Sequence, residues 1–235
     1  MRTFKHVSLI AAAMGAAVLI ALAGCGNKAA SDQAVSLDTD RAKASYTVGV
    51  NIGRNFKDGY VDVDPAIVAR AMQDVLENRT LLMSEEQMTE AMNTLQTTIQ
   101  NRYQQVVTDN QKAASDFLAA NAKKEGMITL PDSLQYQIIT AGTGPKPAAT
   151  DTVEVHYQGT LLDGTVFDSS VQRNEPVQFS MDQVIPGWTE VIQLMPVGSK
   201  WRVFIPPQLA YGEEGRPGIP PNSLLTFEIE LLQIL

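Results

Sequence analysis

The segment from Ser84 to Glu125 restricts the fold of this chain most, because it contains neither glycine nor proline. Ser84 and Gln87 have the spacing of a capping box at a helix start, and Gly126 has the place of a C-cap residue. These signals predict one uninterrupted helix of about 60 Å, at about 1.5 Å per residue. A helix of this length divides the chain into an N-terminal and a C-terminal part.

The predicted long helix changes character along its length. Apolar residues follow at steps of four and three in its first half, at Met88, Met92, Leu95 and Ile99. The second half is mostly polar, with isolated apolar residues at Val106, Val107, Phe117 and Leu118. A helix that is apolar first and polar later is expected to pack at one end and to be solvated at the other. We therefore expect residues 84–125 to form a stalk between two bodies.

Residues 38–83 are expected to be all helical. Apolar side chains in residues 39–56 have helical spacing, and Asp64 followed by Pro65 is typical of an N-cap and a first helical position. The helix that starts there carries one apolar stripe, formed by Ile67, Val68, Ala71, Met72, Val75 and Leu76.

This N-terminal helical region contains little apolar mass for a core of its own, since roughly 50 residues is near the lower limit for an independent domain. Four methionines, whose side chains suit adaptable contact surfaces, gather in it and at the start of the long helix: Met72, Met83, Met88 and Met92. We expect these residues to pair with a second copy of the chain as a homodimer. The alternative is that they form the core of a monomeric bundle.

The first 24 residues have the pattern of a secretory signal, with a short basic start and a small apolar core. The apolar core is at the short edge of what a membrane span needs, which leaves a transmembrane anchor as the alternative. The sequence Leu22-Ala23-Gly24-Cys25 resembles a bacterial lipobox, which implies lipidation of Cys25, the only cysteine. This placement favours a lipoprotein signal over a transmembrane anchor, and a plain cleaved signal is the alternative that remains. We expect membrane attachment through this lipid and a flexible tether over residues 25–37. Gly26 favours the outer membrane, with the protein facing the periplasm or the cell surface.

Residues 127–235 are expected to form an antiparallel sheet packed on one short helix, so the fold class is α+β. Apolar residues alternate with period two at Val153, Val155 and Tyr157, and again from Leu225 to Leu231. The short helix is predicted over residues 188–195.

Composition excludes several function classes. The net charge of −8 disfavours nucleic-acid binding, which depends on neutralising phosphates. The two histidines are His6, in the signal segment, and His156, which alternates onto the outer face of a predicted strand. No Ser-His-Asp or Cys-His arrangement is therefore available, and no metal or cofactor site is expected. Asp163 and Asp168 lie in turn-like sequence and do not predict a glycosidase pair.

Aromatic residues gather in the C-terminal part together with a set of ordered motifs. Val155-His156-Tyr157, Asp163-Gly164, Phe167-Asp168-Ser169-Ser170, Val184-Ile185, Gly187-Trp188, Ala210-Tyr211-Gly212 and Phe227 together resemble the FKBP-type peptidyl-prolyl cis-trans isomerases. The N-terminal part, with Ser45-Tyr46 and Asn55-Phe56, resembles the dimeric macrophage infectivity potentiator (Mip) subgroup. The resemblance covers nearly all of the mature chain.

The resemblance implies roles for individual residues. Trp188 would form the floor beneath the proline ring, and the walls would be Tyr157, Phe167, Val184, Ile185 and Phe227. The Tyr211 hydroxyl would donate a hydrogen bond to a substrate carbonyl, and the backbone N–H of Ile185 would hold a flanking carbonyl. Asp168 would lie against the rotating carbonyl, held by Tyr157 and Arg173. The sequence departs from the family at Val177, where a Phe is common, and at Arg216 and Ile219, which we expect at the rim of the pocket.

We therefore expect an isomerase that accelerates rotation of X-Pro bonds in proline-containing polypeptides without a cofactor, and that binds macrolides of the FK506 and rapamycin type. The physics agrees, because no heavy-atom bond is broken and a dry aromatic pocket disfavours the planar amide. The first alternative is a dimeric chaperone that clamps unfolded clients, with incidental isomerase activity. The second is an envelope lipoprotein that uses the domain only as a binding surface.

Overall fold

A computed structural model describes residues 35–235. The expected signal peptide, Cys25 and nearly all of the tether lie outside the described residues. Two helices come first, α1 (Asp40–Asp58) and α2 (Pro65–Leu76). The Asp64 carboxylate accepts a hydrogen bond from the Ala66 N–H at 2.8 Å, which confirms the predicted start of α2. Within residues 35–235, none of the helices combines the length and the apolar character that a membrane crossing requires.

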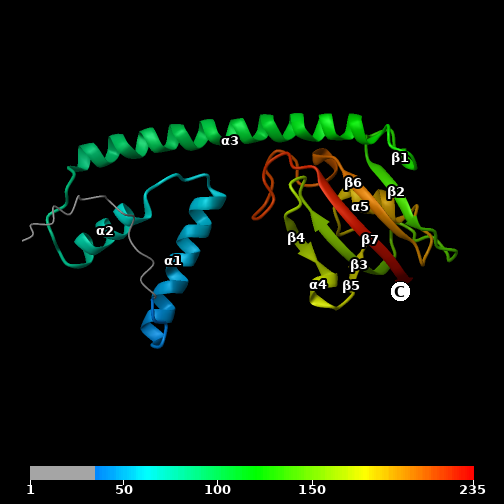
Figure 1. Cartoon of the computed structure of the whole chain (residues 1–235), viewed down its shortest axis with the longest axis horizontal. Helices are drawn as coiled ribbons and strands as arrows, with labels where there is room; N and C mark the ends of the chain where they lie inside the picture. Colours follow the sequence, from blue (N-terminus) through cyan, green and yellow to red (C-terminus); the bar gives the residue numbers. More distant parts are fainter. Residues whose placement is uncertain (1–34) are drawn as a thin grey trace, which may run out of the picture. The chain divides into compact units, whose positions relative to one another are not determined.

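The long helix α3 spans Glu85–Asn121 (Figure 1). The capping box at its start is confirmed, since Ser84 Oγ accepts from the Gln87 N–H and Gln87 Oε1 accepts from the Ser84 N–H. The predicted end at Glu125 is wrong by one helical turn. Asn121 is buried and donates through Nδ2 to Gln135 Oε1 at 2.9 Å, which ties the helix end to the following sheet. Gly126, with φ +74°, shapes the turn into the first strand and is not the C-cap.

The polar composition of the second half of α3 predicted that it is solvated on all sides, but one of its faces is buried. Ala114 and Leu118 are buried against Phe204 and Leu224. The Phe117 ring meets that of Phe204 at 5.4 Å. These apolar residues recur at steps of three and four, so they lie on one face of the helix although most of their neighbours are polar. That face fixes α3 to the C-terminal domain.

The C-terminal domain is one antiparallel sheet, and together with the helices it confirms the predicted α+β class (Figure 1). The order of strands is β1-β2-β6-β7-β3-β4, with β5 pairing to β3. The bounds are β1 Met127–Thr129, β2 Gln135–Thr140, β3 Thr152–Thr160, β4 Val166–Ser169, β5 Val177–Ser180, β6 Lys200–Ile205 and β7 Leu225–Ile234. Between them lie α4 (Ser170–Arg173), α5 (Pro186–Ile192) and the 3-10 helix η1 (Pro207–Leu209).

The core of this domain lies between the sheet and α5. Every second residue of β3 is buried, and the predicted inward face of β7 is buried as well. Pro186 occupies the first turn of α5, so this helix begins two residues before the predicted Trp188 and ends at Ile192. Trp188 and Val191 point from α5 into the core, which brings the indole toward the aromatic residues of β3 and β7.

Candidate active site

Trp188 is the centre of an aromatic cluster. Its ring forms T-shaped pairs with Tyr157 at 5.2 Å, with Phe179 at 5.3 Å and with Phe227 at 5.2 Å between ring centres. Edge-to-face pairs of this kind add about 0.5–1.5 kcal/mol each beyond their buried area. Phe167 extends the group by meeting Phe227 at 5.6 Å and 89°. We call these five residues the Trp188 cluster.

Gly159 allows two rings of this cluster to approach the sheet. A Cβ at this position of β3 would lie 2.5 Å from Phe167 Cζ and 2.8 Å from Phe227 Cε1. Such distances are far inside van der Waals contact, and both neighbours are rigid rings, so no side chain fits here. The motif glycine therefore sets the position of one aromatic wall.

The centre of the cluster is buried, and the side chains around it are partly exposed to solvent. Trp188 and Phe227 are each 4% exposed. The side chains that pack around them are only partly buried: Phe167, Val177, Val184, Ile185 and Tyr211. The structure thus brings together the residues predicted for floor and walls. Ile219 differs from the expected rim position, since it is buried in the core, where the turn between Arg216 and Ile219 directs it inward.

A hydrogen-bonded acid lies at the edge of the cluster. The Tyr157 hydroxyl donates to Asp168 Oδ2 at 2.6 Å, and Arg173 Nη1 donates to Asp168 Oδ1 at 2.7 Å. Arg173 Nη2 also donates to the Tyr157 hydroxyl at 3.3 Å. The predicted turn-like setting of Asp168 is wrong, because this residue lies in β4, where it pairs with Gly159 of β3. The short strand explains why the carboxylate is held beside the Trp188 cluster.

These contacts keep the acid ionised. Burial of the Asp168 carboxyl opposes its ionisation, but the hydrogen bonds from Tyr157 and Arg173 outweigh burial, so the pKa of Asp168 lies below its usual value. The pKa of Tyr157 is raised, mainly by burial of its hydroxyl and secondly by its hydrogen bond to the Asp168 carboxylate. Asp168 is therefore a fixed negative charge and hydrogen-bond acceptor, and it is unsuited to donating a proton at neutral pH.

Tyr211 stands at the start of the loop between η1 and β7. Arg216 Nη1 donates to the Tyr211 hydroxyl at 2.9 Å, and the guanidinium carbon lies 4.9 Å from the Tyr211 ring centre. Because the tyrosine oxygen accepts this bond, its own proton stays free to donate. Arg216 was predicted only as a departure at the rim, and its contact with Tyr211 is new.

Phe179 was missed as a site residue. It lies in β5 opposite Val153, and it contacts both Tyr157 and Trp188. Its alternation with Val177, which the sequence showed, would have placed both on one face of β5.

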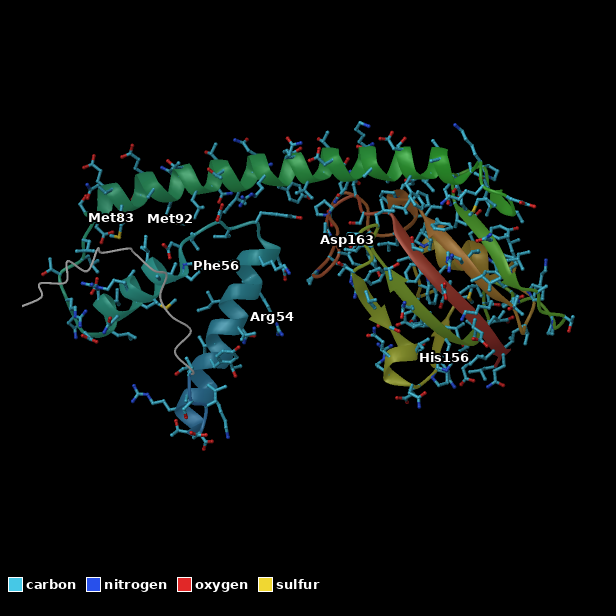
Figure 2. All side chains as sticks on the ribbon, viewed as in Figure 1. Arg54, Phe56, Met83, Met92, His156 and Asp163 are labelled. Atoms are coloured by element: carbon cyan, nitrogen blue, oxygen red, sulfur yellow. The ribbon has the colours of Figure 1, made fainter. Side chains whose placement is uncertain are left out.

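His156 is half-buried rather than at the surface, because the short helix α4 contacts β3 beside it. Its Nδ1 lies 3.0 Å from Ser170 Oγ, which also accepts the Tyr157 N–H at 2.8 Å. Within residues 35–235, there is no group of three or more His, Cys, Asp or Glu side chains that could hold a metal ion. Figure 2 shows His156 and Asp163 among the side chains of the sheet domain.

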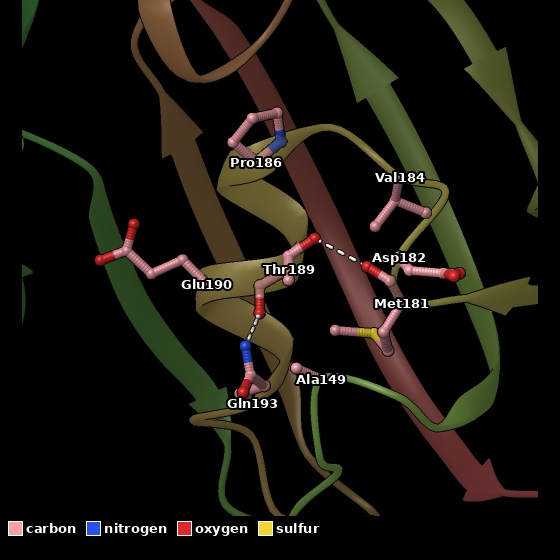
Figure 3. A pocket seen from close by; sticks show the side chains of 8 residues that line it. All are labelled: Ala149, Met181, Asp182, Val184, Pro186, Thr189, Glu190 and Gln193. Atoms are coloured by element: carbon pink, nitrogen blue, oxygen red, sulfur yellow. Dashed lines mark hydrogen bonds between the residues drawn. The ribbon is translucent and has the colours of Figure 1, made fainter.

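A hollow of about 590 Å³ lies beside α5 (Figure 3). Its lining includes Val184, Pro186 and Glu190. Thr189 Oγ1 donates to the Met181 carbonyl at 2.8 Å and so ties α5 to the segment after β5. The pKa of Glu190 is raised to about 7, first by burial of its carboxyl and then by the hydrogen bond with Asp132 and its charge.

Glu190 predicts a pH dependence of stability. Its folded pKa of about 7 exceeds the reference value of 4.5, so the protonated carboxyl stabilises the fold fully below about pH 4.5. This contribution is lost as pH rises through 7. We expect Glu190→Gln to flatten the fall in the free energy of unfolding between these pH values, measured by urea unfolding. Parallel pH curves for variant and wild type would contradict the assignment.

Comparisons with known proteins agree with this geometry. The family model described as FKBP-type peptidyl-prolyl cis-trans isomerase matches residues 144–232. The model described as the domain amino terminal to FKBP-type peptidyl-prolyl isomerase matches residues 41–138. Together the two matches include nearly all of α1, all of α2 and α3, and nearly the whole sheet domain.

Individual relatives match along the whole length. The chain is 44% identical to the outer membrane protein MIP of Legionella longbeachae, over 98% of both chains. It is 39% identical to FkpA of Aeromonas hydrophila, described as an FKBP-type peptidyl-prolyl cis-trans isomerase, over 100% of this chain and 96% of that protein. The crystal structure of FkpA from Escherichia coli superposes with a TM-score of 0.62 at 34% identity, covering 85% of this chain and 98% of that one.

Proposed function

Because the chain belongs to the FKBP-type peptidyl-prolyl cis-trans isomerases, we propose that the Trp188 cluster is the place where the prolyl bond rotates. The chain accelerates cis-trans isomerisation of X-Pro bonds in proline-containing polypeptides. One observation carries the assignment of the site. Trp188 forms T-shaped pairs with three aromatic rings, beside an acid that Tyr157 and Arg173 keep ionised.

The reaction needs little more than such a site. Rotation about a peptide bond has a barrier of about 18–20 kcal/mol, and each tenfold acceleration requires about 1.36 kcal/mol. Twisting the bond removes amide resonance and lowers its dipole. Water stabilises the planar, polar ground state, whereas apolar rings stabilise it less, so transfer to the cluster favours the twisted form. No nucleophile or general acid is required.

The proline ring would rest on Trp188, between the walls formed by Tyr157, Phe167 and Phe227. The Tyr211 hydroxyl, whose oxygen already accepts from Arg216, would donate to a substrate carbonyl. The Ile185 N–H would hold a flanking carbonyl. Asp168 would face the rotating carbonyl, where its fixed charge acts on the carbon end of the changing dipole. Val184, Ile185 and Val177 would complete the apolar rim, with Ile219 supporting the loop from within.

The assay that tests this site uses the chain from Gly26 onward and a proline-containing tetrapeptide. We expect turnover to follow saturation kinetics and to be inhibited by a rapamycin-type macrolide, which would occupy the Trp188 cluster. Tryptophan fluorescence should report the binding, because Trp188 lies at the contact. Macrolide binding that leaves both turnover and fluorescence unchanged would contradict the site.

We further propose that the protein is attached to the outer membrane by lipid on Cys25, facing the periplasm or the surface. The Legionella longbeachae relative is named an outer membrane protein, and that name supports an envelope location for this chain. Residues 1–24 would be the signal peptide, 25–37 the tether and 127–235 the isomerase domain. Labelling cells with a radioactive fatty acid should mark the wild type and leave Cys25→Ala unmarked.

We also propose that residues 38–83 and the start of α3 form the dimer contact. Large apolar side chains are exposed there, among them Ile67 at 68%, Leu76 at 82% and Met92 at 62%. Figure 2 shows Met83 just before the start of α3 and Met92 in the first part of this helix. Met72 and Met83 are exposed as well, and Met88 is half-buried. A second copy is the occupant that would cover this surface.

We expect Met92→Glu to weaken this dimer at least about tenfold, because a charge would be buried against apolar side chains. Sedimentation velocity over a dilution series measures the shift to monomer. Thr94→Glu is the matched control, since two residues further on the added charge lies on the opposite side of α3. A monomeric wild type would contradict the proposal.

A further inference from the structure

Residues 212–222, the central part of the loop between η1 and β7, are attached to α3 by three hydrogen bonds. We call them the Tyr211 loop, because they directly follow Tyr211. The Tyr103 hydroxyl donates to the Glu213 carbonyl at 2.7 Å. Asn110 Nδ2 donates to the Pro221 carbonyl at 2.7 Å, and Asn222 Nδ2 donates to the Val107 carbonyl at 3.4 Å. One helix face therefore holds both ends of the loop that follows Tyr211.

The loop is internally connected, so fixing its ends fixes its interior. Asn222 N–H donates to the Gly212 carbonyl at 2.8 Å and closes the base. Arg216 and Ile219 exchange two backbone hydrogen bonds, of 2.9 and 2.7 Å. Gly215 N–H donates to the Tyr211 carbonyl at 3.2 Å. A displacement of the base would thus be carried to Arg216, whose guanidinium contacts the Tyr211 hydroxyl.

These bonds do not merely accompany close packing. A hollow of about 390 Å³ remains between α3, η1 and the loop, and Gln111, Ser115, Gln208 and Glu213 are among its lining residues. Where packing is incomplete, the position of the loop depends on the directed bonds from Tyr103 and Asn110. Both side chains are half-buried, and their separation of seven residues places them two turns apart on one face of α3.

We propose that Tyr103 and Asn110 are positioning residues for prolyl isomerisation, which hold the Tyr211 loop so that the Tyr211 hydroxyl faces the substrate before it binds. The helix is thereby part of the isomerase machinery in addition to connecting two parts of the chain. This inference rests on the proposed role of Tyr211. Without the two side chains, the loop would have to be ordered by the substrate, and part of the binding free energy would be lost.

The test compares Tyr103→Phe, Asn110→Ala and the double variant in the full mature chain. Because the double variant removes two of the three hydrogen bonds that hold the loop, we expect it to raise KM for a proline tetrapeptide about fivefold or more, with kcat within about twofold. Backbone amide exchange at Arg216 and Ile219 should quicken. Gln105→Ala, an exposed change on the same helix, should leave KM and exchange at wild-type values.

A double-mutant cycle separates positioning from a general loss of stability. In a Tyr211→Phe background, the double variant should raise KM less than about twofold, because the group it positions is gone. Additive effects, or wild-type KM and exchange in the double variant, would overturn the inference. Tyr103→Phe removes a single oxygen and keeps the test open if Asn110→Ala does not fold. An inactive wild type would instead sink the assigned site.

Discussion

Replacement of Asp168 by alanine is expected to lower kcat/KM for prolyl isomerisation by about 100-fold, the size typical for removing a group aimed at the transition state. The change removes the acceptor of two hydrogen bonds, from Tyr157 at 2.6 Å and from Arg173 at 2.7 Å. Tyr157 would lose its orientation against Trp188, and Arg173 would be left without its charge partner. The loss should fall mainly on kcat, since the apolar floor that binds the proline ring is untouched.

The pH profile gives a second readout for Asp168. Its pKa lies below the usual value, because the bonds from Tyr157 and Arg173 outweigh the burial of the carboxyl. Wild-type kcat/KM should therefore be flat between about pH 5 and 8, where the carboxylate stays ionised. A depressed folded pKa also means that its contribution to stability is present above the unfolded pKa and is lost as pH falls through the folded value.

Asp163→Ala is the matched control for Asp168→Ala. Asp163 is an exposed acid in the turn before β4, where its carboxylate accepts from the Thr165 N–H, which lowers its pKa as well. Both variants remove one charge from neighbouring sequence, but only one touches the Trp188 cluster. Equal losses in the two variants would contradict the role of Asp168.

The chaperone alternative is tested by measuring the suppression of client aggregation beside isomerase turnover. Suppression that survives in Asp168→Ala, while turnover is lost, would support clamping of unfolded clients.

Periodicity and motif order predicted the sheet domain well, since both depend on local sequence. Val153, Val155 and Tyr157 are buried as their alternation indicated, and the residues expected around Trp188 lie there. The helix start at Ser84 was equally readable, because a capping box is complete within four residues.

The features that sequence could not predict depend on partners far along the chain. Phe117 and Leu118 looked like isolated apolar residues, because their partners Phe204 and Leu224 come much later. The bond from Tyr103 to Glu213 joins residues that are 110 positions apart, and an exposed-looking tyrosine gives no sign of it. Asp168 resembled a turn residue because β4 is only four residues long. Tertiary pairing, and not local propensity, decided each of these cases.

Trp188→Ala is expected to destabilise the domain by about 3–5 kcal/mol, the cost of removing a large buried ring and leaving a cavity. The indole is 4% exposed and is the common contact of Tyr157, Phe179 and Phe227, so its removal takes one ring contact from each of them and leaves a cavity between them. The measurement is urea unfolding followed by circular dichroism. Turnover should be lost as well, but a variant this unstable does not separate binding from folding.

The substitution Trp188→Phe separates substrate binding from folding, and Trp201→Phe is its control. Both tryptophans are buried, and neither indole N–H has a hydrogen-bond partner within residues 35–235. Replacement by phenylalanine therefore removes no hydrogen bond at either site and costs mainly packing, about 1–2 kcal/mol in both. Trp201 stacks on Tyr136 at 4.3 Å, outside the Trp188 cluster. If the proline ring rests on Trp188, Trp188→Phe lowers kcat/KM several-fold while Trp201→Phe leaves it unchanged. Equal kcat/KM losses at matched stability would place the reaction elsewhere in the domain.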